Sequence, residues 1–190
     1  MKSLLAKNAE VLVTMDDARR ELKDAGLYAV DGVIKQVGPT EELPKTADVV
    51  VNLSGQIVLP GLVNTHHHLN QTLVRNLPAA QNNNLFPWLR AQYRIWAGTT
   101  PEASRVSTLI GLAELALSGC TTVFDHSYIF KSGNTVDCQI EAAKEIGVRL
   151  SRQPRLDVVG RIQRRIAAGR LCRRRRLHPP GQPACHRTIP

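Results

Sequence analysis

Strand-like and helix-like segments follow one another along residues 61–151, and this order limits the folds open to the chain. Three segments are short and apolar, as buried parallel strands are: residues 61–66, 120–127 and 148–151. Three others have helical spacing: residues 85–98, 99–120 and 134–147. Strand, helix and strand in succession are typical of a parallel sheet or a (β/α)₈ barrel. Only about three of the eight units of such a barrel are recognisable, so we predict an α/β fold with an incomplete barrel.

The helix predicted at residues 99–120 has the clearest boundaries. Thr100 can cap its first turn, Pro101 suits the first helical position and Gly119 can end it. Its apolar residues recur at three- and four-residue spacing, which predicts one buried stripe: Val106, Leu109, Ile110, Ala113, Ala116 and Leu117.

The first 54 residues have the pattern of a smaller β-unit. Runs rich in Val, Ile and Leu indicate short strands within residues 9–15, 26–38 and 47–61. Asp31 and Gly32 lie between two apolar runs, where a hairpin turn is expected. We therefore predict an antiparallel β-unit over residues 1–54 and barrel units over residues 55–150.

Residues 151–190 differ from the rest of the chain in charge. They contain eleven Arg, no Lys and a single acid, Asp157, which gives a net charge of +10. The other 150 residues carry 14 basic and 15 acidic side chains, so the overall charge of +9 comes from this segment. It also shows no sustained helix or strand period. We expect residues 151–190 to be a tail outside the barrel pattern, either frameshifted or disordered.

Three consecutive histidines follow the first predicted barrel strand, in PGLVNTHHHLNQ (residues 60–71). Side chains on a strand alternate between its faces, so His66 and His68 point one way and His67 the other. Two imidazoles at this spacing can hold one divalent ion, and imidazole suits zinc and iron alike. A polar loop with three histidines is the alternative. The cost of placing imidazoles beside a core without a partner favours the metal site.

Three segments resemble the amidohydrolase superfamily: PGLVNTHHHLNQT, LFPWL and ALSGCTTVFDHSYIF. The resemblance is to its aminohydrolase branch, especially the 8-oxoguanine and isoxanthopterin deaminases, with the hydroxytriazine hydrolases nearby. It covers residues 1–150 and implies the N-terminal portion of a (β/α)₈ barrel preceded by part of a β-sandwich. It also implies a hydrolase that deaminates a heterocyclic small molecule with one divalent metal ion, Zn or Fe. The full-length form would be a homo-oligomer.

The resemblance assigns roles to individual residues. The family's HxH motif falls on His66 and His68 as metal ligands. Gln71 lies on the loop that contacts the ring amide in such enzymes, or is a solvated glutamine at a helix start. Trp88 stacks on a flat ring or belongs to the core. His126, at the end of the second strand, contacts substrate or a loop carbonyl.

Other parts of the family's site are not recognisable. The family uses further histidines, a Glu that moves protons and an Asp at the last strand, whereas His178 and His186 have no strand around them. We therefore assign no catalytic residue and expect the 190-residue chain to be inactive by itself. A triazine-type amino- or chlorohydrolase would share the same two histidines and is the alternative enzyme.

The tail has three interpretations. We favour a frameshifted end, because Asp codons of the form GAC read one base over give CGA codons for Arg, and the family continues with an acidic segment. A genuine arm centred on residues 173–176 would bind phosphates and make the chain a nucleic-acid-binding module. A natural short protein completed by a partner subunit ranks last, because exposed sheet edges invite aggregation.

Cysteine spacing and hydropathy bear on the compartment. The four cysteines form no CxxC pair, which favours reduced thiols. The apolar run near the N-terminus is too short for a signal peptide, and no apolar segment is long enough to span a membrane. We expect a cytoplasmic protein with a heterocyclic small-molecule substrate, no membrane partner and no nucleic-acid partner.

Overall fold

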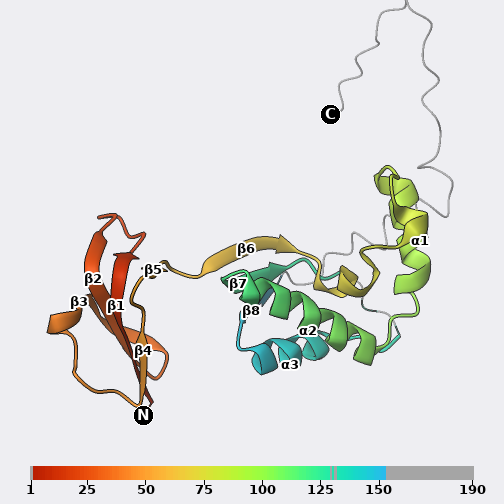
Figure 1. The fold of residues 1–190 in the computed structure, drawn as a ribbon. Helices are drawn as coiled ribbons and strands as arrows, with labels where there is room; N and C mark the ends of the chain where they lie inside the picture. The colour runs from red at the N-terminus through yellow and green to blue at the C-terminus, as the bar shows by residue number, and fades with distance from the viewer. Residues whose placement is uncertain (1, 129, 131, 153–190) are drawn as a thin grey trace, which may run out of the picture. The chain divides into compact units, whose positions relative to one another are not determined.

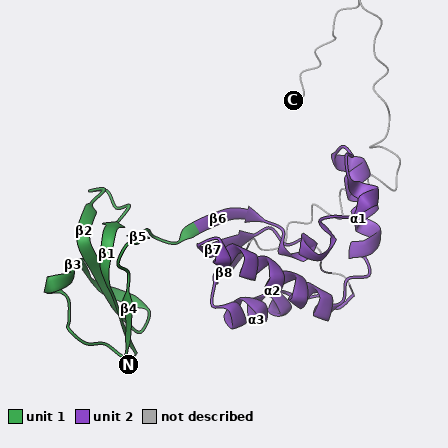
Figure 2. Cartoon of the chain, viewed as in Figure 1, with its two compact units in different colours: residues 1–62 green, residues 63–190 purple. Residues whose placement is uncertain are grey.

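The computed structural model describes residues 2–128, 130 and 132–152. The chain divides into two compact units, residues 1–62 and residues 63 onward (Figures 1 and 2). The Arg-rich run at residues 173–176 lies outside the described residues, and so do His178 and His186.

The first unit is a five-stranded sheet with the order β3-β2-β1-β4, in which β5 also pairs with β1. Its strands are β1 (Ser3–Val13), β2 (Glu21–Val30), β3 (Val33–Pro39), β4 (Val49–Asn52) and β5 (Ile57–Val58). The first three strands are antiparallel, as predicted, but β4 and β5 run parallel to β1. Asp31 and Gly32 form the turn between β2 and β3, and both have the positive φ that a tight hairpin requires.

A close approach of two backbones shapes the middle of this sheet. The register of β1 against β2 shifts between Ala6 and Ala9. Opposite this irregularity, a Cβ atom on Gly26 would lie only 2.2 Å from the carbonyl oxygen of Ala6. Ala9 and Ala25 are fully buried beside it. Glycine is therefore required at position 26, because any side chain would separate β1 from β2.

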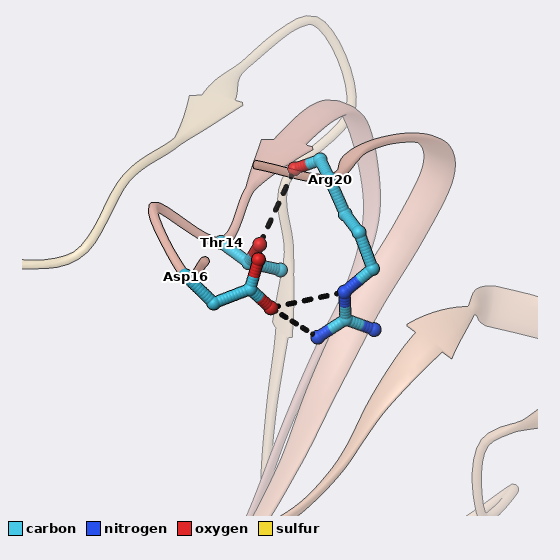
Figure 3. A network of polar contacts seen from close by, with 3 residues as sticks. All are labelled: Thr14, Asp16 and Arg20. Carbon is cyan, nitrogen blue, oxygen red and sulfur yellow. Dashed lines mark hydrogen bonds and ion pairs between the residues drawn. The ribbon is translucent and has the colours of Figure 1, made fainter. Parts of the chain in front are cut away.

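The turn between β1 and β2 carries a small polar network (Figure 3). Arg20 donates from Nε and Nη2 to Oδ2 of Asp16, at 3.0 and 2.7 Å. The hydroxyl of Thr14 donates to the carbonyl oxygen of Arg20 at 3.4 Å. The bond from Arg20 holds the pKa of Asp16 below its usual value. These side chains are exposed, so the network orders the turn and contributes little to stability.

The second unit follows the predicted strand and helix order. It contains β6 (Leu62–His67), α1 (Leu85–Trp96), α2 (Pro101–Leu117), β7 (Cys120–Asp125), α3 (Val136–Ile146) and β8 (Arg149–Arg152). The strands form a sheet with the order β6-β7-β8, and β7 pairs with β8 in parallel. Two 3₁₀ helices, η2 (Leu69–Val74) and η3 (Pro78–Ala80), lie between β6 and α1. Within the described residues, no helix combines the length and apolarity that a membrane span requires.

Helix α2 begins and ends as predicted but buries a different face. The hydroxyl of Thr100 accepts a hydrogen bond from the amide of Ala103 at 3.2 Å, and Gly119 has a positive φ just beyond the helix. The predicted apolar stripe is wrong, since Leu117 is 90% exposed and Ile110 is 39% exposed. The buried residues are instead mostly small and polar: Ser104, Ser107, Thr108, Gly111 and Leu112.

The buried face of α2 is small because η2 packs closely against it. The hydroxyl of Ser107 donates to the carbonyl oxygen of Leu69 at 2.7 Å. A Cβ atom on Gly111 would lie 2.9 Å from Cδ2 of Leu69 and 2.8 Å from Oγ1 of Thr72. Larger side chains at these positions would push η2 away from the helix. Helix α2 therefore fixes the segment that directly follows the three histidines.

Candidate metal centre

The end of strand β6 brings together His66, on the strand, and His68, which directly follows it. Their Nε2 atoms are 3.3 Å apart, although His67 separates them in the sequence. Two nitrogens that each lie about 2.0–2.1 Å from a tetrahedral zinc ion are about 3.3–3.4 Å apart. His66 and His68, called the metal pair below because both are candidate metal ligands, therefore fit two corners of a tetrahedral metal site. No group of three or more His, Cys, Asp or Glu side chains among the described residues has the arrangement of a metal site, so the donor set there consists of these two rings.

A backbone contact fixes which nitrogen of His68 is available. Nδ1 of His68 lies 2.8 Å from the carbonyl oxygen of His126. A carbonyl oxygen only accepts hydrogen bonds, so Nδ1 carries the proton and Nε2 of the neutral ring keeps its lone pair. Metal-binding histidines in proteins are commonly oriented by such a bond from the second ring nitrogen. The geometry therefore presents Nε2 of His68 as a ligand.

His126 lies directly beside the pair. Its ring stacks on that of His66, with centroids 4.2 Å apart and an interplanar angle of 21°. Its Nε2 lies 3.4 Å from the carbonyl oxygen of Thr65, and its amide donates to the carbonyl oxygen of His67 at 2.8 Å. The ring of His126 therefore contacts both the His66 ring and a backbone carbonyl of β6.

Gln71 bonds to a tyrosine that sequence reasoning missed. Nε2 of Gln71 donates to the hydroxyl oxygen of Tyr128 at 2.8 Å. Burial raises the pKa of Tyr128 to about 12, so its phenol stays protonated at ordinary pH. The ring of Tyr128 also meets that of His68 edge-on, at a centroid distance of 5.2 Å. Gln71 is therefore tied to the metal pair through Tyr128.

Trp88 lies at one end of a chain of aromatic rings. It meets Trp96 at a centroid distance of 5.6 Å and an angle of 72°. Trp96 is only 1% exposed and also contacts Tyr93 and Tyr128. Trp96 is therefore the core residue of this group, whereas Trp88 is half-buried and keeps part of its surface accessible.

Asp125 is a second functional candidate that sequence reasoning missed. It is fully buried at the end of β7. Its Oδ1 accepts from the amide of Leu69 at 2.8 Å and its Oδ2 accepts from Nε2 of Gln139 at 2.9 Å. Burial raises the pKa of Asp125, and these two bonds oppose that rise. An acid at the end of an apolar strand, directly before a histidine, is the signal that could have found it.

Burial also sets the charge state of the central histidines. It lowers the pKa of His68 below the ordinary value of 6.5, against the opposing bond to the His126 carbonyl. It lowers the pKa of His67 as well. Within the part of the chain that the structure describes, Nδ1 of His67 is buried and has no hydrogen-bond partner. The rings of His67 and His68 are therefore neutral at neutral pH, as a metal ligand must be.

Parallel strands joined by helices, with paired histidines at a strand end, are the features of a barrel enzyme that binds a metal ion. Comparison with known families gives the same class. Residues 57–176 match the Amidohydrolase family. The chain therefore belongs to this family. The family and the fold class predicted from the sequence are confirmed.

Two proteins of known activity and one solved structure illustrate which members of the family this chain is similar to. The chain is 42% identical over 127 residues to an 8-oxoguanine deaminase of Pseudomonas aeruginosa, covering 65% of this chain and 28% of that protein. It is 35% identical over 156 residues to an isoxanthopterin deaminase of an unknown prokaryotic organism, covering 77% and 32%. A solved atrazine chlorohydrolase of Arthrobacter aurescens TC1, complexed with zinc, matches with a TM-score of 0.70 and 31% identity, covering 78% and 35%. The chain thus spans about a third of the length of these relatives.

Proposed function

We propose that this chain supplies the first two metal ligands, and part of the substrate-facing wall, of a metal-dependent aminohydrolase. The enzyme would remove an amino group, as ammonia, from a nitrogen heterocycle of the purine or pterin type. The observation that carries the proposal is the 3.3 Å separation of the Nε2 atoms of His66 and His68, with the His68 proton held on Nδ1. Zinc is the proposed ion, because tetrahedral zinc accepts two imidazoles at this spacing.

His66 and His68 would hold the ion through their Nε2 atoms. When bound, a divalent ion of this kind activates water for attack on an electrophilic carbon. His126 would keep the ring of His66 in place by stacking and the ring of His68 in place through its carbonyl oxygen. The chain's own contribution is therefore a pair of ligands whose orientation is set before the metal arrives.

Gln71 and Trp88 would face the substrate. The side-chain oxygen of Gln71 can accept a hydrogen bond from a ring N–H, while its nitrogen stays bonded to Tyr128. The accessible part of Trp88 would stack on a flat heterocycle, with Trp96 supporting it from behind. Because Tyr128 contacts both Gln71 and His68, it would link substrate recognition to the metal pair.

A triazine-type amino- or chlorohydrolase is the second candidate. It is supported by the similarity to the zinc-complexed atrazine chlorohydrolase. The two candidates share His66 and His68 and differ in the ring that Gln71 and Trp88 would receive. In an enzyme that completes this site, a panel containing 8-oxoguanine, isoxanthopterin and a chlorotriazine would separate them by the substrate that is consumed.

Metal binding by the purified 190-residue chain tests the proposal. Competition with a chromophoric chelator should detect one Zn²⁺ per chain, and His66→Ala and His68→Ala should each abolish this site. His67→Ala is the matched control and should bind Zn²⁺ like the wild type. Equal binding by all three variants, or no binding by the wild type, would overturn the proposal. We expect no turnover of the panel by this chain, because its described residues supply two ligands and no third.

A further inference from the structure

We propose that Asp125 is a positioning residue for His68, and that its carboxylate sets the ligand by fixing the peptide that follows it. The inference rests on the proposed function in one respect, namely that His68 is a metal ligand. Asp125 does not touch the metal pair itself. It acts through the backbone of Leu69, the next residue after His68.

Both oxygens of the Asp125 carboxylate are used by neutral donors. Oδ1 accepts from the amide of Leu69 at 2.8 Å, and Oδ2 accepts from Nε2 of Gln139 at 2.9 Å. Asp125 and Leu69 are both 0% exposed. A buried acid that serves only to stabilise the fold is usually paired with a cation. Here the carboxylate instead accepts from one backbone amide and one side-chain amide, both of them neutral.

Leu69 is held on its other side as well. Its carbonyl oxygen accepts from the hydroxyls of Ser107 and Thr72, at 2.7 and 3.0 Å. The residue is therefore bonded to β7 through its amide and to α2 through its carbonyl. Because these bonds come from two elements, Leu69 cannot shift without breaking at least one of them. The Cα atom of His68 lies at the start of this fixed peptide.

Two consecutive residues at the end of β7 thus control His68. The carbonyl oxygen of His126 accepts from the His68 ring, and the carboxylate of Asp125 accepts from the amide after it. One bond sets the rotation of the ring, and the other sets the backbone that carries it. Metal–ligand distances in proteins fall within about 0.2 Å of their standard values, so the position of each ligand matters. Loss of the Asp125 bond should therefore weaken the site before it unfolds the protein.

The test compares Asp125→Leu, which has a similar shape and no acceptor, with Asp125→Asn. The asparagine variant keeps an oxygen for the Leu69 amide. Its new N–H faces Nε2 of Gln139 and donates to Oε1 once the Gln139 amide rotates by half a turn; this Oε1 is buried without a partner among the described residues. Val123→Ala is the control, because Val123 is also 0% exposed on β7. It removes core contacts without touching the Asp125 bonds. Should Asp125→Leu not fold, Asp125→Ala makes the same comparison without added bulk.

Two readouts separate positioning from stability. In the metal-free chain at pH 8, long-range ¹H–¹⁵N NMR reports which nitrogen of His68 carries the proton, and chelator competition reports the Kd for Zn²⁺. We expect the Nδ1–H form in the wild type and in Asp125→Asn, with similar Kd values. Asp125→Leu should give mixed tautomers and a Kd about 10- to 100-fold higher. Val123→Ala should lower the melting temperature and change neither readout.

The inference is overturned if Asp125→Leu changes the tautomer and the Kd no more than Val123→Ala does. It is also overturned if Asp125→Asn is as damaging as Asp125→Leu. A wild-type chain that binds no Zn²⁺ refutes the proposed function instead. The tautomer comparison needs no metal, so it still decides the role of Asp125 in that case.

Discussion

Gly111→Ala tests whether the close contact between α2 and η2 supports the metal pair. The new Cβ atom would lie 2.9 Å from Cδ2 of Leu69 and 2.8 Å from Oγ1 of Thr72, whereas ordinary contacts begin at 3.4 Å. Both atoms belong to buried side chains of η2, which have little room to rotate in a close-packed interior. A shift of η2 by about half an ångström would relieve the contact, and it exceeds the roughly 0.2 Å range of metal–ligand distances in proteins. Leu69 directly follows His68, so the shift should reach the ligand.

The expected change in stability is small because two terms oppose each other. Replacing a helical glycine by alanine stabilises a helix by about 1 kcal/mol. Overpacking a buried contact costs about 1–3 kcal/mol. The net loss should be between about zero and 2 kcal/mol, while the Kd for Zn²⁺ rises by about tenfold or more, as for other residues that orient metal ligands.

The assay follows unfolding and metal binding in parallel. Both tryptophans of the chain, Trp88 and Trp96, belong to the second unit, so their fluorescence in urea reports the stability of that unit. Chelator competition gives the Kd. Ala116→Gly, at an exposed position of the same helix, is the control and should lose about 1 kcal/mol with no change in Kd. A Gly111→Ala variant that is more stable than the wild type, with an unchanged Kd, would refute the reasoning.

Three further predictions concern local features. Gly26→Ala should destabilise the first unit by roughly 2–4 kcal/mol, because its Cβ would meet the Ala6 carbonyl at 2.2 Å; an unchanged circular-dichroism melt would contradict this. Thr100→Ala removes the α2 cap and should cost about 1 kcal/mol, which Thr100→Ser should restore; equal urea midpoints for both variants would argue against the cap. Burial lowers the pKa of His68, so below about pH 6.5 the unfolded state binds more protons than the folded state. Stability should therefore decrease as the pH is lowered. An NMR titration that placed this pKa above 6.5 would reverse that sign.

Features set by neighbouring residues could be predicted from the sequence. The start of α2 depends on Thr100 and Pro101, and its end on Gly119, all of which act within one helical turn. The turn at Asp31 and Gly32 is equally local. The parallel pairing of β4 and β5 with β1 could not be predicted, because it depends on contacts between distant segments.

The buried face of α2 shows why an apolar pattern was misleading. Leu117 and Ile110 belong to the apolar stripe, yet they are exposed, while Ser107 and Gly111 are buried. The deciding factor is the neighbour. The carbonyl oxygen of Leu69 on η2 accepts from the hydroxyl of Ser107, and the side chains of Leu69 and Thr72 leave no room for a side chain at Gly111. The spacing of apolar residues in a sequence does not reveal which groups of another element pack against them.

The candidate site likewise contains residues whose roles could be predicted from the sequence and residues whose roles could not. His66 and His68 could be paired from strand alternation alone, because they are two residues apart. Asp125 and Tyr128 could not be assigned roles, because their partners Leu69 and Gln71 are 56 and 57 residues away in the sequence. The distance between a side chain and its partner along the chain therefore decided what sequence reasoning could reach.

The bonds between the ends of β6 and β7 also set an order of events during synthesis. His68 is translated long before Asp125 and His126. The bond between His68 and His126 bridges 58 residues, and the bond between Leu69 and Asp125 bridges 56. A growing polypeptide that has emerged only as far as His68 holds both imidazoles but nothing to orient them. Closing this long loop is slow compared with forming a helix. A metal ion captured once β7 has docked would favour the closed loop by mass action, so ion uptake in the cell should follow the first crossover and then help to retain it.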